Sequence, residues 1–346
     1  MLTTNGLAPG ELLLDWNESP LGPPSAAVRR VVDAAHHLHE YPRGLMEEVT
    51  ALAAGYLSLP ASHLLLTSGV DEALDLTMTL ADRGWAVTPG FDFHARVVAC
   101  DKPFHDIPLG SDWQPAAFPE KLGVRDAVFI AQPGNPTGNL IEPSWIDKFQ
   151  ATAGYFFRDE TYQEFCSVPS ILASGLNDDR TLVYRSFAKA FGLAGIRVGC
   201  LIARPELIDR LAPFRRFMPI DAVSLHAAAG VLEEPGFITT LASHVLRLRP
   251  LLVAVLKDSG LFVDVRDTET NFVIARVGPG QADAFVAALA DHRIRVKSCD
   301  YFGLHDWIRI GVGTEDGLRR LADTLDQIRG ERATRLDTDS ASGESQ

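Results

Sequence analysis

Short apolar runs alternate with segments of helical period along most of this chain. The runs are rich in β-branched and aromatic residues, as buried strands are, and they lie at 63–67, 126–132, 155–159, 181–186 and 196–203. "DEALDLTMTLA" (71–81) and "PSWIDKFQATA" carry apolar residues at helical spacing, and "WAVTP" with "FHARVVAC" forms another strand–helix pair. This alternation predicts an α/β fold, with a mostly parallel central sheet flanked by helices.

The pattern changes after about residue 235. A long helical stretch, "LASHVLRLRPLLVAVLKDSG", leads to the short strands "LFVDV", "NFVIARV" and "WIRIGV" and two helices. We therefore expect a large domain over 31–235 and a smaller α+β domain over 236–330. "SAAVRRVVDAAHHLHE" predicts a helix with Ser25 as its N-cap. Residues 331–346 are polar and Ser-rich, which favours a disordered tail.

Composition narrows the class of protein. The 346 residues are 46% hydrophobic, which is enough for a sizeable core. The formal net charge is −13, which argues against binding to a nucleic-acid backbone. The four cysteines are far apart, which argues against a disulfide framework or a zinc site. We find no signal peptide and no run expected to span a membrane, so we expect a cytoplasmic protein.

Candidate chemistry follows the ends of the predicted strands. "PGNPTGN" (133–139) follows one strand, Asp159 and Glu160 follow another, and "SFAKAFGLAGIRVG" (186–199) follows a third. The amides of Gly69, Val70 and Asp71 would open a helix and form an anion site. An amine at Lys189, a carboxylate at Asp159 and a phosphate site with Arg197 are the groups that pyridoxal 5′-phosphate requires.

In these segments the chain resembles the fold-type-I aminotransferases, and within them the histidinol-phosphate aminotransferase family. The similarity also covers "LDWNESPLGP", "YPRG", "SGVDEALDL", "RDETYQEF", "TETNFVIARV" and "IRIGVGT". The resemblance implies that Lys189 forms the Schiff base and moves the substrate proton, and that Asp159 pairs with the pyridine nitrogen. It also implies that Asn135 and Tyr162 bind the phenolic oxygen of the cofactor and that Phe91 stacks on the ring.

The same resemblance implies further ligands. Ser186, Arg197 and the helix amides would bind the cofactor phosphate, and Tyr41 would reach the phosphate of a neighbouring subunit in a homodimer. Arg309 would bind the carboxylate of the substrate or its counterpart group. An N-terminal segment, 1–30, would associate with the small domain and line the substrate pocket through Trp16 and Asn17.

Three positions depart from the family pattern. Ala188 stands where serine is usual, which removes one hydroxyl from the phosphate site. Lys297 stands where the family usually has an arginine for the distal phosphate of histidinol phosphate, and no tyrosine precedes Trp16.

The activity that the resemblance implies is ping-pong amino transfer between an amino-acid-like intermediate and a 2-oxo acid such as 2-oxoglutarate.

Other interpretations stay open at this point. A decarboxylase or cyclase using the same cofactor would need the same residues, and a non-catalytic binding protein could share the fold. Ser186 and Lys189 also satisfy the Ser-x-x-Lys pattern of serine acyl-transferases, although its companion motifs are missing. His36, His39 and Glu40 could suggest a metal site, but a solvated helix end fits them better.

Overall fold

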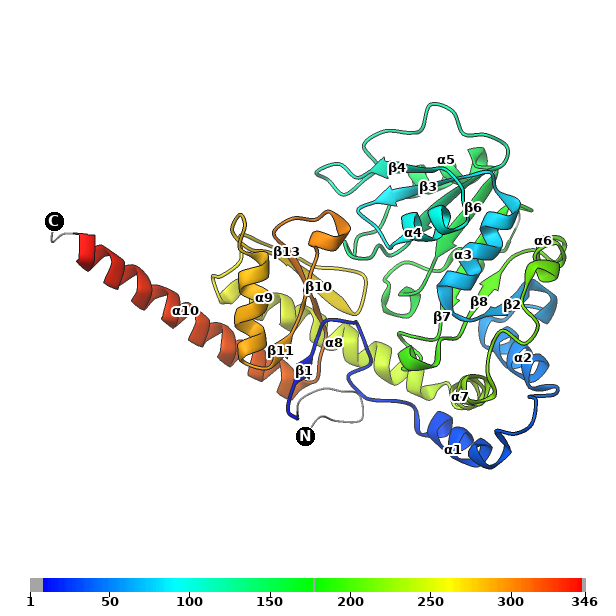
Figure 1. Ribbon diagram of the computed structural model, residues 1–346, viewed down its shortest axis with the longest axis horizontal. Coiled ribbons are helices and arrows are strands. Elements are labelled where there is room, and N and C mark those ends of the chain that lie inside the picture. Colours follow the sequence, from blue (N-terminus) through cyan, green and yellow to red (C-terminus); the bar gives the residue numbers. More distant parts are fainter. Residues whose placement is uncertain (1–8, 177, 344–346) are drawn as a thin grey trace. The chain divides into compact units, whose positions relative to one another are not determined.

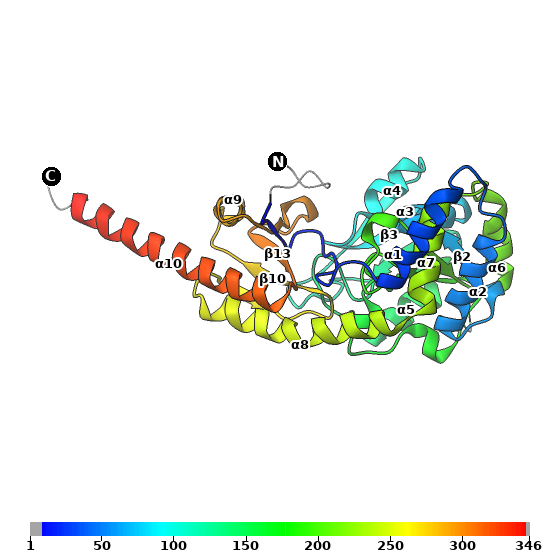
Figure 2. The same ribbon diagram turned by 90° about the horizontal axis from the view of Figure 1, so that it is seen from below.

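The computed structural model describes residues 9–176 and 178–343, with side chains described up to Glu331. The chain divides into two compact units (Figures 1 and 2). The larger unit spans residues 21–243, and the smaller one combines residues 1–20 with residues 244–346. Each unit is described by itself.

A seven-stranded sheet in the order β2-β8-β7-β6-β5-β3-β4 forms the centre of the larger unit. Strands β3 to β7 run parallel, whereas β8 is antiparallel to both β7 and β2. The strands are β2 (Leu64–Thr67), β3 (Arg83–Thr88), β4 (Phe104–Pro108), β5 (Asp126–Ala131), β6 (Tyr155–Asp159), β7 (Thr181–Ser186) and β8 (Gly199–Ile202). The α/β class predicted from the sequence is confirmed.

Helices cover both faces of this sheet. One buried cluster joins α3, α4 and α6 to alternate strand residues that include Phe129, Phe157 and Tyr184. A second cluster joins α5 to the residues between them, including Val128 and Phe156. The helices are α3 (Gly69–Leu80), α4 (Phe93–Ala99), α5 (Pro143–Thr152) and α6 (Pro205–Leu211). Burial on both faces explains why these strands read as continuous apolar runs.

Three further helices pack together within the larger unit: α1 (Ser25–Ala34), α2 (Leu45–Leu57) and α7 (Ala222–Glu233). Helix α7 contacts both others (Figure 1). Helix α1 approaches it closely at Gly230. A Cβ atom at Gly230 would lie 2.6 Å from the Ala26 carbonyl oxygen. The α1–α7 contact places residues 21–30 in the larger unit, although the sequence interpretation grouped them with the N-terminal segment.

The smaller unit contains a four-stranded antiparallel sheet in the order β12-β13-β10-β9, and β1 pairs in parallel with β11. Its strands are β1 (Leu12–Leu13), β9 (Asp264–Arg266), β10 (Phe272–Arg276), β11 (Ile294–Arg295), β12 (Lys297–Ser298) and β13 (Trp307–Gly311). Its helices are α9 (Ala282–Asp291) and α10 (Glu315–Gly343), and α8 (Gly236–Asp258) enters it from residue 244 onwards.

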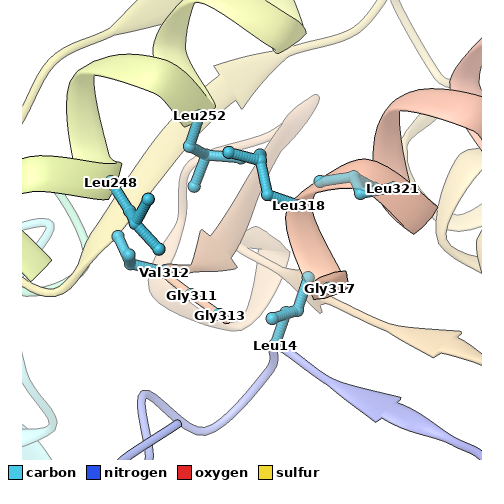
Figure 3. Close-up of a pocket in the computed structure, with 9 residues that line it drawn as sticks. All are labelled: Leu14, Leu248, Leu252, Gly311, Val312, Gly313, Gly317, Leu318 and Leu321. Carbon is cyan, nitrogen blue, oxygen red and sulfur yellow. The ribbon is translucent and has the colours of Figure 1, made fainter. Parts of the chain in front are cut away.

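Helices α8 and α10 meet in an apolar interior with the N-terminal segment (Figure 3). Leu248 and Leu252 of α8 face Leu318 and Leu321 of α10, with Leu14 beside Gly317, around a cavity of about 10 Å³. That volume is near the smallest that could hold a water molecule, so this is packed core. Within the described residues α8 alone is long and apolar enough to cross a membrane by length and composition, which for a single helix is weak evidence of a membrane span.

Several local expectations differ from the structure. Pro24, not Ser25, is the N-cap of α1, because Ser25 already begins the helix. The strand expected over 196–203 is shortened to β8, since residues 194–196 form a 3-10 turn and Arg197 is left-handed. The backbone of 331–343 continues α10 where a disordered tail was expected, as its alanine and arginine residues permit; residues 344–346 lie outside the described residues.

The contact at Gly230 generates a stability prediction. Gly230→Ala should lower the free energy of unfolding by about 1–3 kcal/mol, because the new methyl group overlaps the α1 backbone. The matched control is Gly55→Ala in α2, which meets nothing within 4 Å and should raise stability by about 0.5–1 kcal/mol. Urea unfolding of both variants tests this, and equal effects of the two would contradict it.

Candidate functional site

The strand register of the larger unit brings the sequence-predicted segments to one edge of its sheet. Thr67 at the end of β2 pairs with Gly199, the first residue of β8, and Gly199 pairs with Ser186 at the end of β7. Asp159 at the end of β6 pairs with Tyr184 of β7 and with Ala131 of β5. Four strand ends and the start of β8 thus meet where open α/β sheets bind ligands.

Asp159 is a buried carboxylate at the end of β6, with 5% of its surface exposed. Its Oδ1 accepts hydrogen bonds from the amide and the hydroxyl of Thr161, at 2.9 and 2.6 Å. Burial raises the pKa of Asp159 to about 6, even though the two Thr161 hydrogen bonds oppose this rise. Such a carboxylate is suited to a cationic partner that would stabilise its ionised form.

Directly behind Asp159 the sheet holds a buried network of four charges. Glu160 is fully buried and forms an ion pair with Arg158, with Nε and Oε1 2.9 Å apart. Arg185 bridges Glu160, at 3.6 Å, and Glu164. Because strand side chains alternate, Arg158, Glu160 and Arg185 lie on the opposite face from Asp159. The four charges cancel, which makes their burial tolerable.

The N-terminus of α3 lies under the side chain of Arg197. A Cβ atom at Gly69 would lie 2.9 Å from Arg197 Nη2, so a residue with a side chain would displace the guanidinium. Arg197 has the left-handed φ of 56°, which is uncommon outside glycine, and its Nη2 lies 3.8 Å from Asp71 Oδ2. A helix N-terminus and an arginine together favour an anion here.

The segment after β7 forms a tight turn that carries Lys189. Ser186 Oγ accepts a hydrogen bond from the amide of Ala188 at 3.1 Å, and the Lys189 carbonyl accepts one from Gly192 at 2.9 Å. Phe187 and Phe191, on either side of Lys189 in the sequence, stack with their ring centroids 4.4 Å apart and stabilise the turn. Ser186 ends a strand and does not open a helix, so the helical setting of a serine acyl-transferase nucleophile is absent at this position.

The loop of "PGNPTGN" is held closed by its own side chains and by a neighbouring loop. Asn139 accepts a hydrogen bond from Thr137, and its Nδ2 donates to the Trp113 carbonyl at 2.6 Å. The Gly134 amide donates to the Asn139 carbonyl at 2.9 Å. Asn135, on this loop, is 9% exposed.

Phe91 follows β3 in the next loop and is partly buried. Its ring meets Phe93 edge-on, with centroids 5.5 Å apart. Tyr162, two residues after Glu160, is 3% exposed.

The other sequence-predicted residues lie elsewhere. Tyr41 is 70% exposed beside a surface pocket of the larger unit that Asp221 also lines. His36, His39 and Glu40 lie on exposed turns, and no group of three metal-ligating side chains was found within residues 9–176 and 178–331.

Arg309 and Lys297 of the smaller unit face each other across β13 and β12. Arg309 is 6% exposed and lies near the rings of Phe272 and Phe302, at 5.3 and 5.8 Å. Trp16 is 69% exposed in the same unit, whereas Asn17 is buried. Two neighbouring cations of this kind favour an acidic ligand.

Sequence reasoning missed two contributors to the site. Thr161 holds Asp159, and the Asp-x-Thr pattern of a local turn could have indicated this hydrogen bond. Arg158 was interpreted only as part of an apolar strand. An arginine within a buried run was the one feature of the sequence that could have indicated its ion pair with Glu160.

Comparison with known proteins gives a consistent result. A histidinol-phosphate aminotransferase of Granulibacter bethesdensis is 27% identical, over 90% of this chain and 88% of its own length. The crystal structure of a putative aminotransferase from Burkholderia pseudomallei is 29% identical with a TM-score of 0.84, covering 93% of this chain and 99% of that one. Histidinol-phosphate aminotransferase from Sinorhizobium meliloti, solved in complex with pyridoxal 5′-phosphate, shares the fold at 20% identity and a TM-score of 0.80, covering 93% and 91%.

The fold and these likenesses define a pyridoxal-phosphate-dependent enzyme of fold type I. More narrowly, the chain belongs to the aminotransferase class I and II family, whose model matches residues 6–325. Within that family it is similar to the histidinol-phosphate aminotransferases, as the sequence motifs indicated.

The buried charge network predicts a non-additive effect of substitutions. Arg158→Met should lower the free energy of unfolding by about 3–5 kcal/mol, because it leaves Glu160 short of one buried partner. The double variant Arg158→Met/Glu160→Gln should lose less than the single one. Denaturant unfolding measures both, and Arg29→Met, which breaks an exposed pair with Glu234, should change stability by less than about 1 kcal/mol.

The raised pKa of Asp159 predicts a pH dependence in the cofactor-free protein. Between about pH 4 and pH 6 the folded chain binds a proton that the unfolded chain releases, so Asp159 makes the fold less stable as the pH rises. Asp159→Asn should therefore stabilise the cofactor-free protein by about 3 kcal/mol above pH 6 and very little below pH 4. Urea unfolding across this range is the measurement; a difference that is constant with pH would rule the prediction out.

Proposed function

We propose that this chain transfers an amino group, in ping-pong order, from an amino-acid-like biosynthetic intermediate to a 2-oxo acid such as 2-oxoglutarate. The observation that carries the proposal is the meeting of a buried carboxylate, Asp159, with the Ser186–Lys189 turn at one sheet edge. The similarity to histidinol-phosphate aminotransferases makes histidinol phosphate the first donor to test.

Two observations support binding of pyridoxal 5′-phosphate by the larger unit. Burial raises the pKa of Asp159 and so disfavours its ionised form, which a protonated pyridine nitrogen would stabilise. Gly69 leaves the space in which Arg197 approaches the α3 N-terminus, as a phosphate site needs. When bound, the cofactor supplies a ring that accepts the electrons left on the substrate Cα.

Each residue around the ring would then have a separate role at the cofactor. Lys189 supplies the amine that holds the cofactor aldehyde, and its freed Nζ carries the proton to and from Cα as a general acid–base. Asp159 keeps the pyridine nitrogen protonated. Asn135 and Tyr162 bind the phenolic oxygen, and Phe91 covers one face of the ring.

The phosphate would be bound by the amides of Gly69, Val70 and Asp71 and by Arg197 and Ser186. Ser186 Oγ accepts a hydrogen bond from the amide of Ala188, which positions the hydroxyl as a candidate donor to the phosphate. Ala188 itself contributes no hydroxyl. We therefore expect cofactor affinity to depend strongly on Arg197.

Substrate recognition would fall to the smaller unit. Arg309 binds the acidic group of the substrate through its two-pronged guanidinium, and Lys297, its neighbour across the strands, adds a second positive charge. A lysine binds phosphate as a point charge, which suits donors with smaller acidic groups as well as histidinol phosphate. Trp16 and Asn17 contribute to the same pocket.

We propose a homodimer in which Tyr41 reaches the cofactor phosphate of the partner subunit. Its exposure beside a surface pocket supports such a contact, because a tyrosine so placed is available to a second copy. Mixing Tyr41→Phe and Lys189→Ala chains would test this sharing: complementation requires one site to draw on both subunits.

The decisive experiment is a panel of amino donors with 2-oxoglutarate, followed by cofactor absorbance and product mass. Histidinol phosphate, aromatic amino acids and small acidic amino acids form the panel. Formation of glutamate and the matching oxo product supports the proposal. Release of carbon dioxide would favour a decarboxylase, and an absorbance that no donor changes would favour a binding protein.

Lys189→Ala should abolish amino transfer while the protein stays folded, because the proposed reaction uses this amine both at the cofactor and at Cα. Steady-state assays at saturating cofactor measure turnover, and circular dichroism checks the fold. Lys148→Ala, whose Nζ lies over the Phe118 ring away from the site, is the control and should keep parent activity. Activity in the Lys189 variant would overturn the assignment.

A further inference from the structure

The N-terminal segment of the smaller unit lies between two strands. The Leu12 and Leu14 amides donate to the Arg293 and Arg295 carbonyls, each at 2.8 Å. On the other side the Gly311 amide of β13 donates to the Leu14 carbonyl at 2.7 Å. This segment is therefore an added strand whose position is set by main-chain hydrogen bonds on both sides.

The next three residues are fastened at both ends by buried side chains. Arg309 Nη2 donates to the Asp15 carbonyl at 2.8 Å, and Asn271 Nδ2 donates to the Asn17 carbonyl at 3.0 Å. Asn271 and Asn17 are each 3% exposed, and Asn17 has a left-handed φ of 55°. Asparagine adopts this left-handed region more readily than other non-glycine residues, so the sequence permits the turn that the two hydrogen bonds fix.

Asn271 has a central place in this arrangement. It precedes β10, and its own carbonyl accepts the Val312 amide at 2.9 Å, just after β13. One residue thus connects the start of β10, the end of β13 and the N-terminal segment. The sequence motif "TETNFVIARV" contains it, but nothing in the proposed chemistry uses it.

We propose that Asn271 is a positioning residue for Arg309. By holding the Asn17 carbonyl, it keeps Asp15 two residues earlier in place, and the Asp15 carbonyl in turn orients the guanidinium. A guanidinium presents its donors in a rigid fork, so fixing one arm fixes the direction of the others. This inference rests on the proposed role of Arg309 in binding the acidic group of the substrate.

The test compares Asn271→Ala and Asn271→Asp with the parent holoenzyme. Both remove the donor, and aspartate also places an oxygen against the Asn17 carbonyl. KM for the best amino donor should rise about tenfold in Asn271→Ala and further in Asn271→Asp, while kcat stays within about twofold, because ground-state and transition-state binding weaken together. The cofactor absorbance should not change.

A second measurement uses the cofactor-free protein. Glu18 follows the fastened residues, so a glutamate-specific protease should cleave after it about tenfold faster in Asn271→Ala than in the parent. The matched control is Ser259→Ala, which removes another buried hydrogen bond of the same unit, to the Leu256 carbonyl at 2.7 Å. This control should change neither KM nor cleavage after Glu18.

The two readouts separate the possible failures. An unchanged KM in both Asn271 variants, or an equal rise in Ser259→Ala, overturns the positioning role. If the parent transfers no amino group from any donor, the proposed function fails. Cleavage after Glu18 then still tests whether Asn271 holds the segment, and equal cleavage rates in variant and parent would contradict the inference.

Discussion

The site depends on the register of four adjacent strands. Thr67, Gly199 and Ser186 lie in one row across β2, β8 and β7, and β6 places Asp159 beside them. A shift of one residue in any of these strands would turn its side chains to the opposite face. Asp159 would then exchange places with Arg158 or Glu160, and a carboxylate suited to a pyridine nitrogen would be replaced by a member of the charge network.

The charge network explains how this register is held at the carboxyl edge. Backbone hydrogen bonds alone would allow strands to slip, but a slip between β6 and β7 would separate Glu160 from Arg185 and weaken the pairing of buried charges. The apolar clusters on the two faces hold the rest of the sheet. Polar groups therefore specify the one end of the sheet at which chemistry is proposed.

Much of the fold could be predicted from the chain because its strands are buried on both faces and appear as compact apolar runs. The residues at the strand ends were also readable, since Lys189, Asp159 and "PGNPTGN" each follow such a run. Strand β4 was missed because "FHDIP" is short and partly polar. The link between Asn271 and Asn17 joins positions 254 residues apart, and no local pattern encodes such a contact. Residues 21–30 were misgrouped for a related reason: the contact of α1 with Gly230 is also distant in sequence.

The smaller unit combines two segments that lie on either side of the larger unit in the sequence, and this affects how it folds during synthesis. Residues 9–20 are translated before the larger unit, yet the partner of their strand, Ile294–Arg295, is translated after it. The larger unit is continuous and can acquire its structure during translation, as N-terminal domains generally do. Leu12 and Leu13 have no partner strand throughout that interval, so a nascent chain that stops short of β11 would expose "ELLLDW" to proteases and chaperones.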